Sequence, residues 1–199
     1  MNTADEKFHR MTEEPLSRLI WELAVPTVIT MLVTAAYNMA DTFFVGRIGT
    51  EATAGVGLIL PVMAIIQAIG FFFGQGSGNF ISRSLGARDF SHAERMAATG
   101  GICAALFGLV LLAAGVVFRG GLLALLGARD GLVDAATIGY ASDYLTFILC
   151  GAPFMCLSCV LNNQLRFQGN AVFAMIGLVS GAVLNCVLDP IFIFIFGLE

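Results

Sequence analysis

The chain has 199 residues, of which 58% are hydrophobic and only 12% are charged, and its formal net charge is −4. Soluble domains carry about 25% charged residues, so this composition excludes an ordinary soluble protein and indicates one embedded in a membrane. The ten Lys and Arg residues are scattered along the chain, which argues against a basic face for nucleic-acid binding.

Residues 1–16 carry charges of both signs, and we expect them to form a cytoplasmic N-terminal tail. The apolar stretch that follows is too long for the h-region of a signal peptide and has no small-residue cleavage site. We therefore expect the mature chain to keep its start.

Five hydrophobic stretches follow, each longer than the roughly 20 residues that a transmembrane helix needs. They lie near residues 17–45, 53–82, 93–118, 133–165 and 170–196. The connections between them are short and polar, except that the segment 119–134 has room for a short interfacial helix. The predicted fold is therefore an all-α integral membrane protein with about five transmembrane helices, which together make up residues 17–199.

The positions of Lys and Arg predict an orientation. If the N-terminus is inside, seven of the ten lie in inner segments and three, Arg47, Arg119 and Arg129, lie in outer ones. Because cytoplasmic loops are enriched in Lys and Arg, we expect a cytoplasmic N-terminus and an external residue 199. The membrane is expected to be a plasma membrane, the inner membrane in a bacterium.

A polar stripe follows one face of the first stretch, where polar residues recur at steps of three and four. Hydrogen bonds between helices would explain its threonines, but not its carboxylate. A carboxylate in hydrocarbon costs at least a few kcal/mol and usually faces a cavity on an ion or substrate path. We therefore predict a functional role for Asp41, with Thr34 and Asn38 lining the pathway. The stripe comprises Thr27, Thr30, Thr34, Asn38 and Asp41.

The fifth stretch repeats Gly177, Gly181, Asn185 and Asp189 at intervals of four. The glycines are expected to permit close helix packing. An amide oxygen one turn from a carboxylate suits a hard cation such as Na⁺. Alternatively, Asp189 lies near the outer interface and is simply hydrated. By residue count, Asp41 and Asp189 lie at similar depth in the outer half of the membrane, where they could share one cavity and one proton or cation.

The second and fourth stretches carry further polar and small residues. Gly70 and Gly74 form a small-residue packing face. Gln67, one turn earlier, either lines a pocket or only packs. Asn162, near the inner end of the fourth stretch, is a candidate for the substrate pathway or is solvated at the interface. The five cysteines all lie in apolar stretches, which favours packing thiols over disulfides or metal ligands.

Three motifs resemble known sequences of one transporter family. Residues 38–49 (NMADTFFVGRIG) resemble the first-helix signature of the multidrug and toxic compound extrusion (MATE) family. Residues 82–89 (SRSLGARD) resemble the loop after its second helix, and residues 185–192 (NCVLDPIF) resemble its fifth helix. The resemblance covers residues 14–199 and identifies the chain as most of a six-helix N-terminal lobe.

The resemblance implies two six-helix lobes that export cationic and amphipathic drug-like compounds against an H⁺ or Na⁺ gradient, surrounded by membrane lipid. It implies a proton or cation site at Asp41, Asn185 and Asp189, which would bind Na⁺ if transport is Na⁺-coupled. No other cofactor is expected. A further ligand in some members is a threonine of the sixth helix, before which this chain stops. With an odd number of helices and no second lobe, the chain is expected to be part of a longer transporter.

Three other functions remain as alternatives. A lipid-linked precursor flippase of related fold would need a more basic cavity than the sequence offers. A structural membrane subunit would not need acids at matched depth. A membrane-embedded enzyme would need a convergent catalytic set, and the sequence contains no Ser-His-Asp, metal-ligand or phosphate-binding motif. We therefore expect a transporter and not an enzyme.

Overall fold

The computed structural model describes residues 14–191, except for the side chains of Asp189 and Pro190. Five long helices and one short helix occur within these residues, and each long helix is apolar and long enough to cross a membrane. This confirms the predicted all-α membrane class. The long helices are α2 (Leu16–Ile48), α3 (Thr50–Gly86), α4 (Phe90–Val117), α6 (Ala135–Phe167) and α7 (Ala171–Pro190).

The short helix α5 (Arg119–Leu125) lies in the segment where a short helix is expected. Arg119 ties it to α6, because its guanidinium donates a hydrogen bond of 2.8 Å to the backbone carbonyl of Ser142. The predicted fifth stretch extends to residue 196, and its part beyond residue 191 lies outside the described residues.

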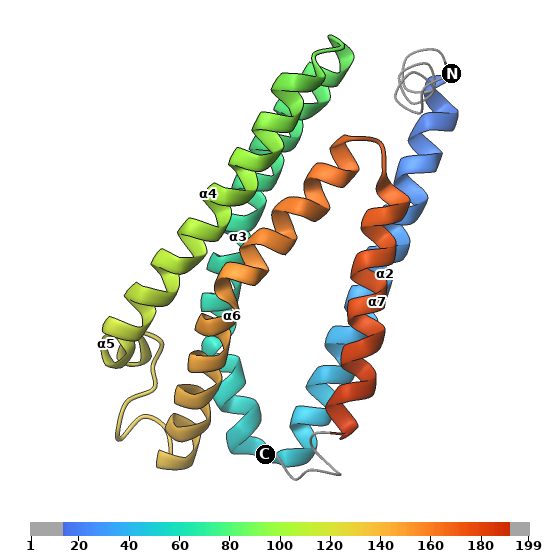
Figure 1. Cartoon of the computed structure of the whole chain (residues 1–199). Helices are drawn as coiled ribbons and strands as arrows, with labels where there is room; N and C mark the ends of the chain where they lie inside the picture. The colour runs from blue at the N-terminus through green and yellow to red at the C-terminus, as the bar shows by residue number, and fades with distance from the viewer. Residues whose placement is uncertain (1–13, 192–199) are drawn as a thin grey trace.

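The helices form two groups (Figure 1). α3 packs along α6 and α4 in one group, and α2 packs along α7 in the other. The turn between α6 and α7 joins the groups at one end, and the turn between α2 and α3 joins them at the opposite end. α2 and α7 run side by side in the same direction, so their C-terminal ends lie at the same end of the molecule.

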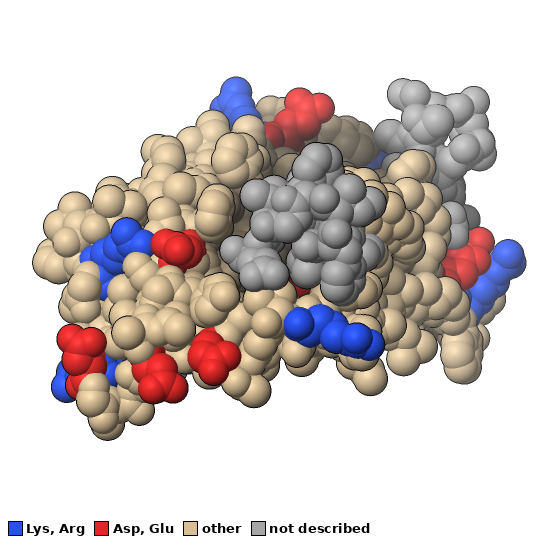
Figure 2. All heavy atoms as spheres, turned by 90° about the horizontal axis from the view of Figure 1, so that it is seen from below, with Lys and Arg blue, Asp and Glu red and all other residues tan. Residues whose placement is uncertain are grey.

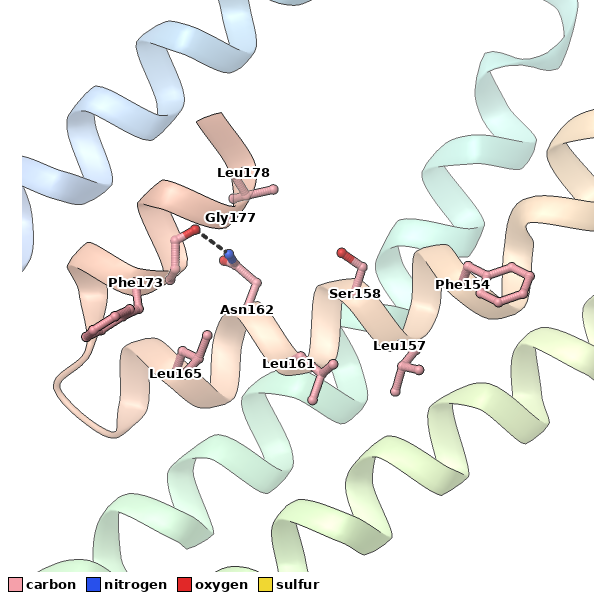
Figure 3. A pocket seen from close by; sticks show the side chains of 10 residues that line it. Phe154, Leu157, Ser158, Leu161, Asn162, Leu165, Phe173, Gly177 and Leu178 are labelled. Carbon is pink, nitrogen blue, oxygen red and sulfur yellow. Dashed lines mark hydrogen bonds between the residues drawn. The ribbon is translucent and has the colours of Figure 1, made fainter. Parts of the chain in front are cut away.

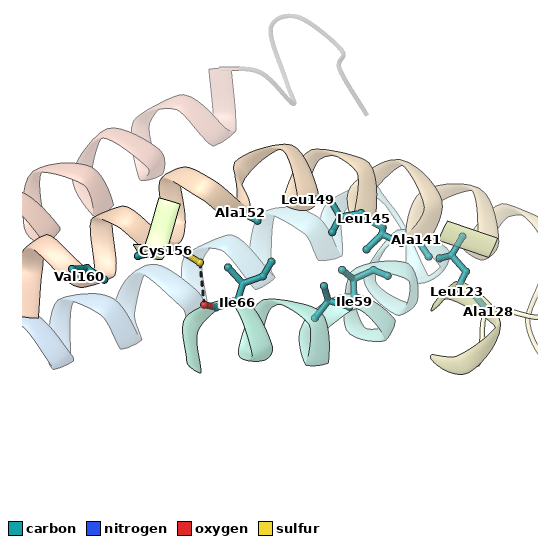
Figure 4. Packing of buried hydrophobic residues seen from close by; sticks show 12 residues of the cluster. Ile59, Ile66, Leu123, Ala128, Ala141, Leu145, Leu149, Ala152, Cys156 and Val160 are labelled. Carbon is teal, nitrogen blue, oxygen red and sulfur yellow. Dashed lines mark hydrogen bonds between the residues drawn. The ribbon is translucent and has the colours of Figure 1, made fainter. Parts of the chain in front are cut away.

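The core lies between α3, α4 and α6 and is made of branched aliphatic side chains and small residues (Figure 4). Ile59 and Ile66 of α3 meet Leu145 and Val160 of α6 in this core, and all four are essentially inaccessible to solvent. Large apolar side chains elsewhere point outward, as with Phe72 of α3 and Phe154 of α6. Exposed apolar surface of this extent is typical of a protein that contacts a membrane or a protein partner.

Glycines allow α3 to approach α6 closely. A Cβ atom added at Gly70 would lie 2.7 Å from Cβ of Cys159, and one at Gly74 would lie 3.0 Å from Cβ of Asn163. This confirms the packing face predicted on the second stretch. The corresponding prediction for Gly177 and Gly181 is wrong, because an added Cβ there would meet nothing within 4 Å among the described atoms. Small residues promote close approach only where a neighbouring helix faces them.

One buried polar group joins all three helices of the core. Gln164 of α6 is 3% exposed, and its amide donates to Ser77 Oγ of α3 at 3.0 Å and to the Ala97 carbonyl of α4 at 3.1 Å. The Ser77 hydroxyl in turn donates to the Phe73 carbonyl at 2.7 Å. Gly100 leaves room for this group, since a Cβ atom there would lie 2.7 Å from Ser77 Cβ. Buried polar groups need such partners.

Candidate functional site

Asp41 lines a cavity of ≈ 520 Å³ between α2, α3 and α6. The cavity brings together Asp41, Asn38 and Gln67, three of the residues singled out in the sequence. Asp41 is half-buried there, whereas Asn38 and Gln67 are exposed. The full lining is Tyr37, Asn38, Asp41, Thr42, Val45, Thr53, Val56, Gly57, Leu60, Met63, Ala64, Gln67 and Tyr144.

Helical spacing explains how these side chains meet. The lining residues of α2 all lie on one face of the helix, because residues three and four apart share a face. They are Tyr37, Asn38, Asp41, Thr42 and Val45. On α3 the lining residues recur in the same way from Thr53 to Gln67. A different face of α3 carries Ile59 and Ile66, which belong to the core with residues of α6. α3 therefore separates the core from the cavity, with one face for each.

Tyr144 of α6 completes the cavity and was not identified from the sequence. Its hydroxyl donates to Met63 Sδ at 3.5 Å, and Tyr144 lines the cavity together with Asp41 and Tyr37. The sequence feature that could have indicated Tyr144 is the segment 140–144, where polar and aromatic residues interrupt an otherwise apolar stretch. Two phenols beside one carboxylate give the cavity hydrogen-bonding groups that are not charged at neutral pH.

Thr34, predicted to line the pathway, is not among the described residues of this cavity. Its hydroxyl donates to the Thr30 carbonyl at 2.8 Å, and Thr30 donates to the Pro26 carbonyl at 2.7 Å. Thr27 donates to the Leu23 carbonyl in the same way, at 2.8 Å. The expectation of hydrogen bonds between helices is therefore wrong for these threonines, whose hydroxyls are satisfied by the preceding turn of their own helix.

Asn162 lies elsewhere, in a second hollow of ≈ 320 Å³ between α6 and α7 (Figure 3). Its side-chain amide donates to the Ala174 carbonyl of α7 at 2.9 Å, and its oxygen accepts from Arg166 Nε at 3.1 Å. The structure does not bring Asn162 together with Asp41. Its contacts link α6 to α7 just before the turn that joins them.

The two predicted cation ligands of α7 are placed only in part. Asn185 is half-buried on α7 and is not among the described residues lining the Asp41 cavity. The side chain of Asp189 lies outside what the structure describes. The side chains that are described contain no cluster of three His, Cys, Asp or Glu residues suited to a metal ion. The parallel pairing of α2 with α7 nevertheless places the C-terminal ends of both helices together (Figure 1).

Charged side chains at this end of the molecule are of both signs. Figure 2, viewed from the end where α2 and α7 finish, shows Lys or Arg beside Asp or Glu over part of the surface, with uncharged residues elsewhere. Among the described residues that line the Asp41 cavity, Asp41 is the one charged side chain and none is Lys or Arg. An acid in an otherwise uncharged cavity attracts cations rather than anions.

Comparison with known proteins identifies the family. The family model described as MatE matches residues 26–191, which is most of the chain. The chain belongs to the MATE family. Its members are membrane transporters and not enzymes, which confirms both the resemblance and the expectation of no enzymatic activity.

Individual relatives agree with this assignment. The multidrug export protein MepA of Staphylococcus aureus (strain MRSA252) is 32% identical over 199 residues, covering 98% of this chain and 42% of MepA. MepA of Staphylococcus saprophyticus is 29% identical over 196 residues, with the same coverage. The chain thus spans less than half the length of these relatives.

Solved structures show the same relationship. An outward-facing multidrug resistance MATE transporter of the MOP superfamily superimposes with a TM-score of 0.88 at 31% identity. A MOP superfamily transporter from Pyrococcus furiosus superimposes with a TM-score of 0.85 at 30% identity. Each comparison covers 100% of this chain and 42% of the solved chain.

Proposed function

We propose that this chain forms most of the N-terminal lobe of a secondary multidrug efflux transporter, which exports cationic and amphipathic compounds in exchange for H⁺ or Na⁺. The observation that carries the proposal is the position of Asp41 in a cavity that otherwise contains only uncharged groups. The relationship to multidrug export proteins supports the same function.

In this proposal Asp41 alternates between a charged state and a protonated or Na⁺-bound state. Asn38, Gln67 and Tyr144 offer amide and hydroxyl groups to whatever occupies the cavity beside it. A ligand shifts a conformational equilibrium only through different affinity for the two states. Proton or cation occupancy of Asp41 therefore favours one state of the lobe, and substrate binding favours the other.

Asn185 and Asp189 belong to the same coupling group in this proposal. Their helix runs beside α2 in the same direction, so movement of one helix along the other changes the distance between the two acids. Two carboxylates that approach each other hold a shared proton or cation more tightly than two that separate. Such a change would connect ion binding to the shape of the lobe.

The proposal includes a second lobe and a defined orientation. Substrate would bind between two lobes whose rocking exposes the site to each side in turn. The N-terminus would lie in the cytoplasm, and the protein would reside in a plasma membrane, the inner membrane of a bacterium. Drug-like compounds, lipid and the second lobe are its partners. A flippase for lipid-linked anionic precursors is less well supported, because no described lining residue of the Asp41 cavity is basic.

Transport by the full-length protein in liposomes tests this proposal. We expect an imposed H⁺ or Na⁺ gradient to drive accumulation of a cationic dye, and collapse of that gradient by an ionophore to stop it. Residues 1–199 alone, reconstituted in parallel, should give the same signal as empty liposomes. Dye movement that is independent of both the H⁺ and the Na⁺ gradient would contradict the antiport mechanism.

A further inference from the structure

We propose that the hollow beside the turn between α3 and α4 binds the phosphate group of an anionic phospholipid. The hollow has a volume of ≈ 410 Å³ and lies at the end of the molecule opposite the α2–α3 turn. Its lining combines one arginine, one histidine, one aspartate and an aromatic ring with two small residues. The lining residues are Phe80, Arg83, Ser84, Ala87, Asp89 and His92.

The position of the hollow suits a lipid. It lies where α3 ends and α4 begins, and both helices are long and apolar enough to cross a membrane, so we place the hollow at the membrane surface. Phe80 precedes Arg83 by three residues, so both lie on one face of α3. Phe80 is 42% exposed, and Phe90 at the start of α4 is equally exposed. A phosphate held by Arg83 would therefore leave its acyl chains beside exposed aromatic rings.

The charges around the hollow favour an anion. Within the part of the chain that the structure describes, Arg83 has no ion pair or hydrogen bond from its side chain, so its five N–H donors are available. Asp89 also lines the hollow, but its carboxylate accepts the His92 backbone N–H at 3.1 Å and lies 2.7 Å from His92 Nδ1. The Asp89 carboxylate is thus already hydrogen-bonded to His92.

Neighbouring residues add to the positive charge. Arg88 and Arg95 lie in or next to the same turn, and Glu94 is the second acid there. Three arginines against two carboxylates leave a net positive turn even with His92 neutral. Basic pockets between transmembrane helices near the membrane surface are suited to anionic lipid headgroups.

Arg88 of this turn has a left-handed backbone conformation. The ends of α3, α5 and α6 share one hydrogen-bonding pattern, in which a left-handed residue follows the helix. That residue is Gly127 after α5 and Gly169 after α6, with φ of 96° and 74°. After α3 it is Arg88, with φ of 59°. Glycine is the least strained residue in this conformation, so Arg88 adopts it at a conformational cost that Gly127 and Gly169 avoid.

Native mass spectrometry of the full-length protein in detergent tests the proposal, with added phosphatidylglycerol or phosphatidylcholine of matched acyl chains. We expect preferential binding of phosphatidylglycerol, reduced several-fold by Arg83→Gln. The control is Arg47→Gln, which removes an exposed arginine from the last turn of α2 at the other end of the bundle and should leave binding unchanged. Ala87→Glu, which adds a negative charge to the hollow without altering Arg83, should also reduce binding.

Three results would overturn the proposal. The first is equal binding of phosphatidylglycerol by the wild type and by folded Arg83→Gln and Ala87→Glu variants. The second is equal binding of the two lipids by the wild type. The third is complete displacement of phosphatidylglycerol by inorganic phosphate at the same concentration, which would assign the hollow to a free anion instead of a lipid. Failure of this site would leave the transport proposal intact, because Arg83 lies far from Asp41 along the helices.

Discussion

Asp41 of α2 and Gln67 of α3 line the same cavity, although the two helices make few contacts with each other along their length. The cavity lies where the α2–α7 pair faces the α3–α4–α6 group (Figure 1). A cavity at the boundary between two groups of helices changes shape when the groups move relative to each other. Polar groups at such a boundary are therefore well placed to couple ion occupancy to conformation.

Close packing of α3 on α6 predicts opposite effects for two substitutions in one helix. Gly70→Ala places a Cβ atom 2.7 Å from Cβ of Cys159, and we expect it to lower the free energy of unfolding by about 1–3 kcal/mol. Gly76→Ala meets nothing within 4 Å and should raise it by up to about 1 kcal/mol, because alanine favours the helix. Unfolding in detergent measures both, and equal effects would contradict the packing assigned to Gly70.

The hydrogen bond between Gln164 and Ser77 predicts measurable coupling between α6 and α3. A double-mutant cycle of Gln164→Leu and Ser77→Ala should give an interaction energy of about 0.6 kcal/mol, the average for such bonds in membrane proteins. Ser77 keeps its own bond to the Phe73 carbonyl in the Gln164→Leu variant, so no hydroxyl is left unsatisfied. Unfolding free energies that add without coupling would show that this contact does not stabilise the bundle.

Asp89 predicts a pH dependence of stability. The backbone N–H of His92, together with its ring and Arg95, holds the pKa of Asp89 below the usual value for aspartate. Because the folded-state pKa is the lower one, the stabilisation is fully present above the unfolded-state pKa and is lost as pH falls through the folded-state pKa.

Asp89→Ala should therefore unfold at lower temperature than the wild type at pH 7, since it removes the N-cap of α4. The difference should shrink as the pH approaches the acidic range where Asp89 takes up a proton. Asp89→Asn, which keeps a capping oxygen without a titratable charge, is the control and should lose the pH dependence. A difference between Asp89→Ala and wild type that stays constant down to that range would refute this account.

The charge distribution predicts which turns face the outside. In a variant without the five native cysteines, we expect an external impermeant thiol reagent to label Leu132→Cys, between α5 and α6, and not Asp89→Cys. Leu132 is 71% exposed, so its accessibility is limited by the membrane and not by burial. External labelling of position 89 would reverse the orientation inferred from Lys and Arg.

The number and type of helices could be predicted from the sequence because length and apolar composition determine membrane insertion. The grouping of α2 with α7, apart from α3, α4 and α6, could not. Where most sides of a helix are apolar, its pattern does not show which face meets which partner. For the same reason the small-residue repeats at Gly70 and Gly177 both predicted close helix packing. Among the described residues, an added Cβ atom meets a neighbouring helix at Gly70 but not at Gly177.

The candidate site was predictable in its acid but not in its surroundings. Asp41 stands out because an acid in an apolar stretch is costly. The threonines of the same stripe recur with the same helical spacing as Asp41. Their hydroxyls nevertheless donate to backbone carbonyls of the preceding turn of α2. Tyr144 enters the cavity from a helix far along the chain, and helical periodicity within one stretch carries no information about such a contact.

The most direct test of the central claim is gradient-driven efflux by the full-length Asp41→Asn variant in liposomes. Asparagine keeps the size and hydrogen bonding of aspartate but cannot titrate or carry charge. Asp143→Asn is the matched control, since Asp143 on α6 is a mostly exposed acid that does not line the Asp41 cavity. We predict that Asp41→Asn inserts normally but exports no more dye than empty liposomes, whereas Asp143→Asn exports like the wild type. Efflux by Asp41→Asn at the wild-type rate would contradict the account.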